Sequence, residues 1–128
     1  MKNFKITNLS DKDIEGINQL YNYYINETAF TFDIKEKNYE EKKEWAKTFS
    51  DEGPHQCLVA YYNNNFIGFA SSRTFRQKEA YFSSVETSVY IDQAYIGNGY
   101  GRYLLSELLK RISKFGVLRA YAFITKPN

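Results

Sequence analysis

Three glycines at alternate positions, Gly97, Gly99 and Gly101, lie between a predicted strand and a predicted helix. Without side chains there, backbone N–H groups at the start of the helix can face one anion, and the helix dipole favours its negative charge. A flexible turn also accounts for a glycine cluster taken alone. The strand before this cluster and the long helix after it favour an anion site.

The spacing of these glycines narrows the choice of anion. A dinucleotide-binding fingerprint needs a third glycine where Arg102 stands, and five residues, Asp92 to Ile96, separate the strand from Gly97. A P-loop needs Gly-Lys followed by Ser or Thr, and the sequence has no such run. Binding of NAD and hydrolysis of a nucleotide are therefore excluded, whereas recognition of a pyrophosphate remains.

The elements that must position this turn are predicted from hydrophobic periodicity. Residues 81–91 alternate as the longest strand candidate, with Glu86, Ser88 and Tyr90 on one face and mainly aliphatic side chains on the other. Leucines at helical spacing predict an amphipathic helix after Gly101, and Gly116 is a plausible stop.

The rest of the chain supplies the other elements of one α/β domain. Ser10 with Asp13, and Asn38 with Glu41, have the spacing of helix N-caps. In chain order we predict strand 4–7, a helix through 14–24, a short helix running to 45–49, strands 57–61 and 66–70 joined by an Asn turn, a charged connection over 73–79, and a last strand over 118–124. This β-α-α-β-β-β-α-β order predicts a largely antiparallel front half.

The composition is that of one globular domain, residues 1–128. Lys plus Arg is 17 and Asp plus Glu is 15, which gives a net charge of +2 and argues against binding of nucleic acid or membranes by bulk charge. No apolar run approaches the roughly 20 residues of a membrane span, and the N-terminus has no apolar signal-peptide core. We therefore expect a cytoplasmic protein.

Cys57 and His55 are the only residues of their types. A single cysteine excludes an internal disulfide, and one Cys with one His cannot supply a closed zinc site, so we expect no metal. The two alternate on the predicted strand and would share a face. A Cys–His nucleophile pair lacks an apparent orienting group, and a small buried cysteine is the commoner role.

Several segments resemble one family. Val89 to Asp92, Ile96 to Arg102 and Leu104-Leu105 are similar to the acetyl-CoA motif of the GNAT superfamily of N-acetyltransferases. Within it the chain most resembles the phosphinothricin acetyltransferase-like group, through Leu20 to Tyr24, Ala29 to Asp33, Phe75 to Tyr81 and Val85 to Tyr90. The resemblance implies a mixed, mostly antiparallel sheet flanked by helices.

The resemblance also implies a reaction. Acetyl-CoA would be the co-substrate, and the acceptor would be the primary amine of a small amino acid or analogue of the phosphinothricin or methionine sulfoximine kind. Glu86 is the candidate general base, since burial moves carboxyl groups toward the neutral range in which a base works. From alternation alone, a solvated glutamate on a polar strand face is an equally open interpretation. A backbone N–H near Val89 or Tyr90 is the candidate donor to the attacked carbonyl.

The remaining site residues are implied by the same resemblance. The predicted cofactor-binding residues are Val89, Tyr90, Ile91, Gly97, Asn98, Gly99, Tyr100, Gly101, Arg102 and Asn128. The predicted substrate-binding residues are Phe32, Arg76, Lys78 and Tyr81. Arg76 suits a carboxylate or phosphinate by its planar fork, although a solvated loop is the alternative for these charges, and Phe32 is as well explained as core.

The sequence departs from the family at two places. Ile96 stands where the family usually has Gln or Arg, and Asn98 where it often has Arg. The last residues, Ile124 to Asn128, resemble the start of the family's next segment, so we expect a domain without the usual last helix and two strands. An uncovered sheet edge would then favour a homodimer or other self-association. Two alternatives stay open: an acyl-CoA-binding module without catalysis, and acetylation of a protein or peptide amine.

Overall fold

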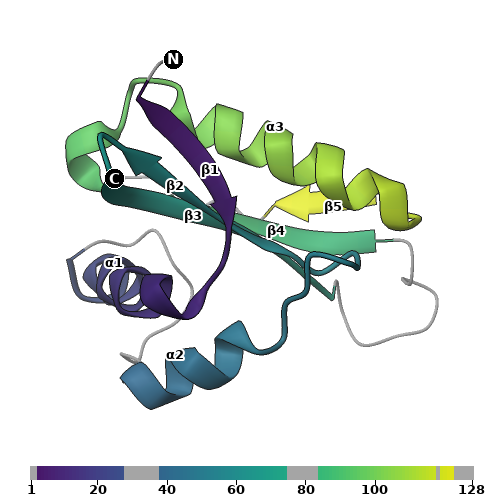
Figure 1. Ribbon diagram of the computed structural model, residues 1–128, viewed down its shortest axis with the longest axis horizontal. Helices are drawn as coiled ribbons and strands as arrows, with labels where there is room; N and C mark the ends of the chain where they lie inside the picture. Colours follow the sequence, from purple (N-terminus) through teal and green to yellow (C-terminus); the bar gives the residue numbers. More distant parts are fainter. Residues whose placement is uncertain (1–2, 28–37, 75–83, 118, 123–128) are drawn as a thin grey trace.

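The computed structural model describes residues 3–27, 38–74, 84–117 and 119–122 (Figure 1). The described strands are β1 (Phe4–Asn8), β2 (Cys57–Tyr62), β3 (Asn65–Thr74), β4 (Ser84–Ile91) and β5 (Arg119–Ala122). The described α helices are α1 (Ile14–Glu27), α2 (Tyr39–Ala46) and α3 (Tyr100–Ile112). The predicted order of elements and the α/β class are confirmed.

The strands form one sheet in the order β1-β2-β3-β4-β5. The first three pairings are antiparallel, and the β4–β5 pairing is parallel. A tight turn joins β2 to β3, whereas α1 and α2 lie in the connection from β1 to β2. The parallel pair requires a crossover between the two strands, and α3 provides it. The glycine turn therefore lies where β4 ends and the crossover helix begins.

Helices cover both faces of this sheet (Figure 1): α3 lies on one face, and α1 and α2 lie on the other. Because side chains alternate along a strand, β2 sends Leu58 and Ala60 toward α3 and Cys57 and Val59 toward α1 and α2. Leu104, Leu108 and Ile112 of α3 complete the first apolar cluster, and Ile17, Leu20 and Tyr24 of α1 complete the second.

Both predicted helix caps are present, and one helix ends earlier than predicted. The Asp13 carboxylate accepts hydrogen bonds from the Ser10 N–H (3.0 Å) and hydroxyl (3.1 Å). Asn38 accepts from the Glu41 N–H (2.8 Å), and the Glu41 side chain accepts from the Asn38 N–H (3.1 Å). α2 ends at Ala46 and does not run through 45–49, because the Thr48 hydroxyl donates to the Trp45 carbonyl (2.7 Å) and competes with helix continuation.

Two other predicted boundaries are wrong. β3 continues through Arg73 and Thr74, which pair in register with Glu86 and Val85 of β4, although their sequence is typical of a polar connection. Pairing with a neighbouring strand outweighs local composition there. His55 precedes β2 instead of lying in it, and its carbonyl accepts from the Ser50 N–H (2.9 Å).

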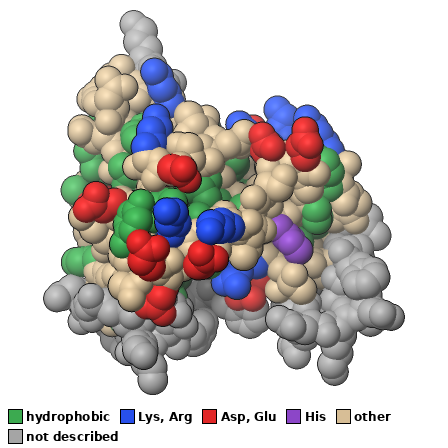
Figure 2. All heavy atoms as spheres, turned by 60° about the horizontal axis from the view of Figure 1, so that its bottom comes forward, with side chains coloured by type: hydrophobic (Ala, Val, Ile, Leu, Met, Phe, Trp, Pro, Cys, Tyr) green, Lys and Arg blue, Asp and Glu red, His purple; other side chains and the backbone are tan. Residues whose placement is uncertain are grey.

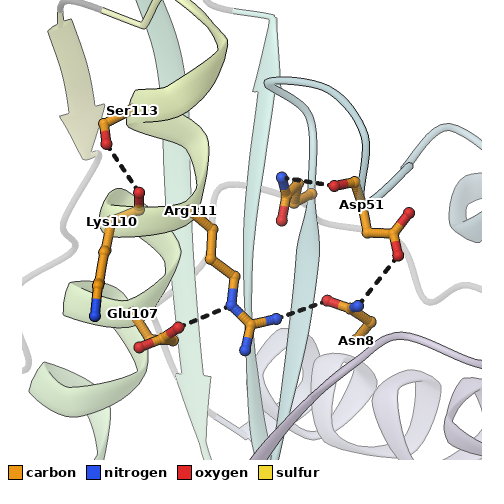
Figure 3. Close-up of polar contacts among 7 residues, drawn as sticks. Asn8, Asp51, Glu107, Lys110, Arg111 and Ser113 are labelled. Carbon is orange, nitrogen blue, oxygen red and sulfur yellow. Dashed lines mark hydrogen bonds and ion pairs between the residues drawn. The ribbon is translucent and has the colours of Figure 1, made fainter.

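A chain of hydrogen bonds joins α3 to the edge of the sheet (Figure 3). Arg111 donates two hydrogen bonds: its Nε donates to the Glu107 carboxylate (2.8 Å), and its Nη1 donates to the Asn8 side-chain oxygen (2.8 Å) at the end of β1. The Asn8 amide in turn donates to Asp51 (3.3 Å) in the loop after α2. The hydrogen bond from Arg111 holds the pKa of Glu107 below its ordinary value.

Replacing Arg111 with Ala should lower the free energy of unfolding by about 1 kcal/mol, because two charge-assisted hydrogen bonds are lost at a partly exposed position. Urea denaturation measures the change in the free energy of unfolding. Lys110→Ala, at an exposed position on the same turn, is the control and should change that free energy by less than about 0.5 kcal/mol.

The effect of Arg111→Ala should also depend on pH. Because the pKa of Glu107 is lowered in the folded state, the stability that Glu107 contributes is present above the pKa of the carboxyl in the unfolded chain and is lost as the pH falls through its pKa in the folded chain. The difference between parent and variant should therefore shrink in acid, and an undiminished difference would contradict the role of Glu107.

Candidate functional site

The glycine turn has a backbone conformation that glycine adopts more readily than other residues. Gly97 (φ +92°) and Gly99 (φ +82°) adopt the left-handed conformation, which side chains rarely tolerate. A Cβ added at either position would meet no atom within 4 Å, so the backbone is open to a ligand. Gly99 is the N-cap of α3, and the first four N–H groups of a helix have no partner within it. The turn therefore presents donors and the positive end of a helix dipole at one open surface.

Gly101 differs from the two glycines before it. A Cβ at Gly101 would lie 3.5 Å from Ile91 and 3.7 Å from Val89, both on β4. These are ordinary van der Waals distances, so a methyl group would fit at this position, and they show that the first turn of α3 lies against the end of β4. Gly101 thus lies at the contact between helix and strand, whereas Gly97 and Gly99 lie at the open surface.

Neighbouring side chains hold the turn in place. Tyr100, the first residue of α3, stacks on Phe4 of β1 with ring centroids 5.0 Å apart and also contacts Tyr62 of β2 at 5.6 Å. Asp92 caps the 3₁₀ turn Gln93–Tyr95 by accepting from the Ala94 N–H (2.9 Å). Asn98 donates from its side chain to the Tyr95 carbonyl (3.3 Å). Ile96 and Arg102 are exposed beside the turn.

β4 extends beyond its described pairing with β5. The register runs from Ser84 opposite Arg119 to Thr87 opposite Ala122, and β4 continues to Ile91. The Asp92 N–H donates to Ile67 of β3 (2.7 Å), so by alternation the N–H groups of Val89 and Ile91 face away from β3, toward the β5 side. The last residues of β4 thus provide main-chain N–H donors next to the glycine turn that follows the strand.

A tyrosine on α1 ties that helix to the same point. The Tyr24 hydroxyl donates to the Ile91 carbonyl (2.5 Å), across 67 residues of sequence. Burial, with Tyr23 and Asp92 nearby, raises the pKa of Tyr24, so the hydroxyl keeps its proton. The helical spacing predicts only that Tyr24 lies on the apolar side of a helix. The sequence signal for its hydrogen bond is that a buried tyrosine hydroxyl needs a polar partner.

Glu86 is half-buried in the middle of the sheet. It pairs with Arg73 of β3 and Tyr121 of β5 and lies on the face covered by α1 and α2. On that face, Tyr90 stacks on Phe69 with centroids 5.1 Å apart and contacts Tyr21 at 5.6 Å. Glu86 therefore lies on a face whose described rings lie toward the glycine turn, and its role as general base stays a prediction.

Only some of the predicted site residues lie in the described part of the chain. Glu86, Val89, Tyr90, Ile91, Gly97, Asn98, Gly99, Tyr100, Gly101 and Arg102 all lie on β4, the turn or the start of α3. The predicted residues Phe32, Arg76, Lys78, Tyr81 and Asn128 lie outside the described residues, and their roles stay predictions.

Other chemistries have little support in the described part of the chain. Cys57 is only 4% exposed, and burial raises the pKa of its thiol, with Asp13 adding to the effect, so the reactive thiolate is disfavoured. Burial and the nearby Arg73 lower the pKa of His55. The described residues hold no group of three or more His, Cys, Asp or Glu side chains that could bind a metal ion, and no helix among them is long and apolar enough to cross a membrane.

Comparison with solved structures shows where this architecture occurs. A GNAT-superfamily phosphinothricin acetyltransferase from Sinorhizobium meliloti, in complex with acetyl-CoA, superposes with a TM-score of 0.87 at 25% identity, over 95% of this chain and 66% of that one. A ribosomal-protein-alanine N-acetyltransferase from Brucella melitensis superposes with a TM-score of 0.88 at 27% identity, over 94% of this chain and 73% of that one. The mixed sheet with helices on both faces is thus the GNAT fold.

Proteins with similar sequences are named as acetyltransferases. The phosphinothricin N-acetyltransferase of Streptomyces coelicolor is 35% identical over 120 residues, which cover 92% of this chain and 70% of that protein. An L-methionine sulfoximine/L-methionine sulfone acetyltransferase of Salmonella typhimurium is 29% identical over 104 residues, which cover 81% of this chain and 60% of that protein. The chain thus spans only part of the length of these relatives. The model of the acetyltransferase (GNAT) family matches residues 17–128, and the chain belongs to that family.

Proposed function

We propose that this chain transfers acetyl from acetyl-CoA to the primary amine of a small amino acid or analogue, of the phosphinothricin or methionine sulfoximine kind. The observation that carries the proposal is the placement of Glu86 and the open glycine turn on one strand and its continuation. The acetyl-CoA complex of the Sinorhizobium meliloti protein and the names of the relatives support the same reaction class.

The geometry suits a long co-substrate. Glu86 and Ile91 are five residues apart on β4, roughly 16 Å at about 3.3 Å per residue. Acetyl-CoA carries its thioester and its pyrophosphate at opposite ends of the pantetheine arm, so one molecule can reach both places. The pyrophosphate would be held by the N–H groups from Gly97 to Arg102, where the backbone at Gly97 and Gly99 is open.

The chemistry then follows from the groups along β4. Glu86 takes a proton from the acceptor's ammonium group, and the free amine attacks the thioester carbonyl. The Val89 N–H, which faces away from β3, stabilises the negative charge that develops on the carbonyl oxygen. As the tetrahedral centre collapses, the new N–C bond stays and the C–S bond breaks. The extra proton on the attacking nitrogen passes to the departing thiolate, so the products are the amide and the free thiol.

Acceptor recognition falls to residues outside the described part of the chain. We propose that Arg76 and Lys78 bind the acceptor's carboxylate or phosphinate, with Phe32 and Tyr81 along its body, and that Asn128 contacts the cofactor. A protein amine is the second candidate acceptor, because the Brucella melitensis structure is named as a ribosomal-protein-alanine N-acetyltransferase. Release of free thiol from acetyl-CoA with a panel of amino acids, and with peptides, separates the two; no release with any amine would indicate an acyl-CoA-binding module.

Substituting Glu86 with Gln should lower turnover by about 10²–10⁴-fold, the usual loss for a general base, with little change in affinity for acetyl-CoA. Thiol-release kinetics measure turnover, and calorimetry measures affinity. Glu15→Gln, at an exposed position on α1, is the matched control and should keep the parent rate. Full activity of Glu86→Gln would show that another group or solvent takes the proton.

Gly99→Val should weaken acetyl-CoA binding by about tenfold or more, because a side chain would stand where the phosphate approaches the N–H groups. Gly116→Val is the control, since Gly116 (φ +81°) is also left-handed and open, at the opposite end of α3. Both variants carry a similar backbone strain of about 1–2 kcal/mol, so both should melt at lower temperature. Equal acetyl-CoA affinities in the two folded variants would remove the turn from cofactor binding.

Tyr24→Phe should weaken acetyl-CoA binding by roughly three- to tenfold, because the last residue of β4 loses the hydroxyl donor from α1. Tyr23→Phe, at the exposed neighbouring position, should leave the affinity unchanged. Calorimetric titration of acetyl-CoA into each variant measures the effect. Equal affinities in parent and Tyr24→Phe would show that this hydrogen bond serves stability alone.

A further inference from the structure

We propose that a hollow at the end of the sheet opposite the glycine turn binds a free amino acid with an apolar side chain, as a second small-molecule site. The hollow has a volume of about 490 Å³ and lies between the end of β1, the start of β2, and the Lys43–Lys47 side of α2. It is built entirely from described residues. The inference concerns binding alone and does not rest on the proposed acetyl transfer.

Gln56 lines this hollow, and its buried side-chain oxygen has no hydrogen-bond partner among the described residues. Gln56 is 2% exposed, and its Nε2 donates to the carbonyls of Gly53 (2.9 Å) and Asp51 (3.3 Å). Its backbone N–H donates to the Ser72 hydroxyl (2.9 Å), so the side chain is held at both ends and the direction of its oxygen is fixed. Oε1 accepts no hydrogen bond from any described residue. Because buried acceptors are nearly always paired, a ligand with an N–H donor fits this position.

The charges around the hollow suit a molecule that carries both signs. Asp11 and Asp51 line the hollow together with Lys43 of α2 and Lys47, the residue that follows α2. Lys47 forms an ion pair with Glu44 (3.0 Å), whereas Lys43 forms no ion pair with any described residue. Asp51 accepts a hydrogen bond from the Asn8 side chain. Figure 2 shows acidic and basic side chains intermixed on the face of α1 and α2. An α-ammonium group near Gln56 and the carboxylates, with an α-carboxylate toward Lys43, matches this arrangement.

Apolar residues form much of the remaining lining, beside the polar Asn8, Ser10 and Ser50. The apolar residues are Leu9, Ile14, Ala46, Phe49 and Cys57, and they favour a ligand with an aliphatic or aromatic side chain. The hollow is separate from the strand that carries Glu86, because the other side of α2 packs inward there. The Lys42 ammonium lies 3.6 Å from the Tyr21 ring centroid, and Trp45 packs against Phe69 at 5.9 Å.

Titration of the ¹⁵N-labelled chain with L-phenylalanine tests the site. Saturable shifts are expected at the Gln56 side-chain NH₂ and at the backbone N–H groups of Ala46 and Ser50. N-acetyl-L-phenylalanine lacks the ammonium group and phenethylamine lacks the carboxylate, so each should bind at least about tenfold more weakly. Equal binding of the three compounds, or no saturable shift, would overturn the proposal and leave Gln56 hydrated.

Variants separate this hollow from the acetyl-transfer site. Ala46→Phe should abolish the Gln56 shifts by filling the hollow, and Lys43→Gln should weaken binding by about tenfold, whereas Lys110→Gln on α3 should not. Glu86→Gln should leave the titration unchanged even where it abolishes thiol release. Shifts confined to Ser88 and Tyr90 would overturn the proposal by placing the amino acid on β4, and they would leave acetyl transfer untouched.

Discussion

The close packing of the first turn of α3 on the end of β4 is the constraint on which the rest of the site depends. Gly101 lies at this contact, where a methyl group would stand 3.5 Å from Ile91 and 3.7 Å from Val89. The left-handed Gly97 and Gly99 turn the chain from the strand into the helix without side chains in the way. Helix donors, the open turn and the end of β4 therefore meet at one place. The parallel β4–β5 pairing follows, since α3 is the crossover between the two strands.

Aromatic side chains hold this junction from both faces of the sheet. Phe4, Tyr62 and Tyr100 pack beside the start of α3, and Tyr21, Tyr24 and Tyr90 pack on the opposite face. Large rings bury much apolar area at low conformational cost, and the Tyr24 hydroxyl adds a directional bond to the Ile91 carbonyl. These six rings therefore support the junction as well as filling apolar space.

At the other end of the sheet the interactions are polar. Arg111, Asn8 and Asp51 connect α3, β1 and the loop after α2, and Gln56 fixes the start of β2 against that loop (Figure 3). α2 divides two environments: Lys42 and Trp45 face the aromatic core, and Lys43 faces the hollow. The domain thus has one end shaped by backbone donors and aromatic packing, and another shaped by side-chain charges around an apolar floor.

The sequence by itself determined the order of elements, both capping boxes, the left-handed turn and the strand position of Glu86. These features are local: periodicity, cap spacing and glycine conformation depend on residues a few positions apart. Only the tertiary structure decided that Arg73 and Thr74 belong to β3, that Tyr24 binds Ile91, that Arg111 reaches Asn8, and that Gln56 is buried with an unpartnered oxygen. Each of these depends on a partner brought near by the folding of the sheet, and such a partner leaves no periodic signal in the chain.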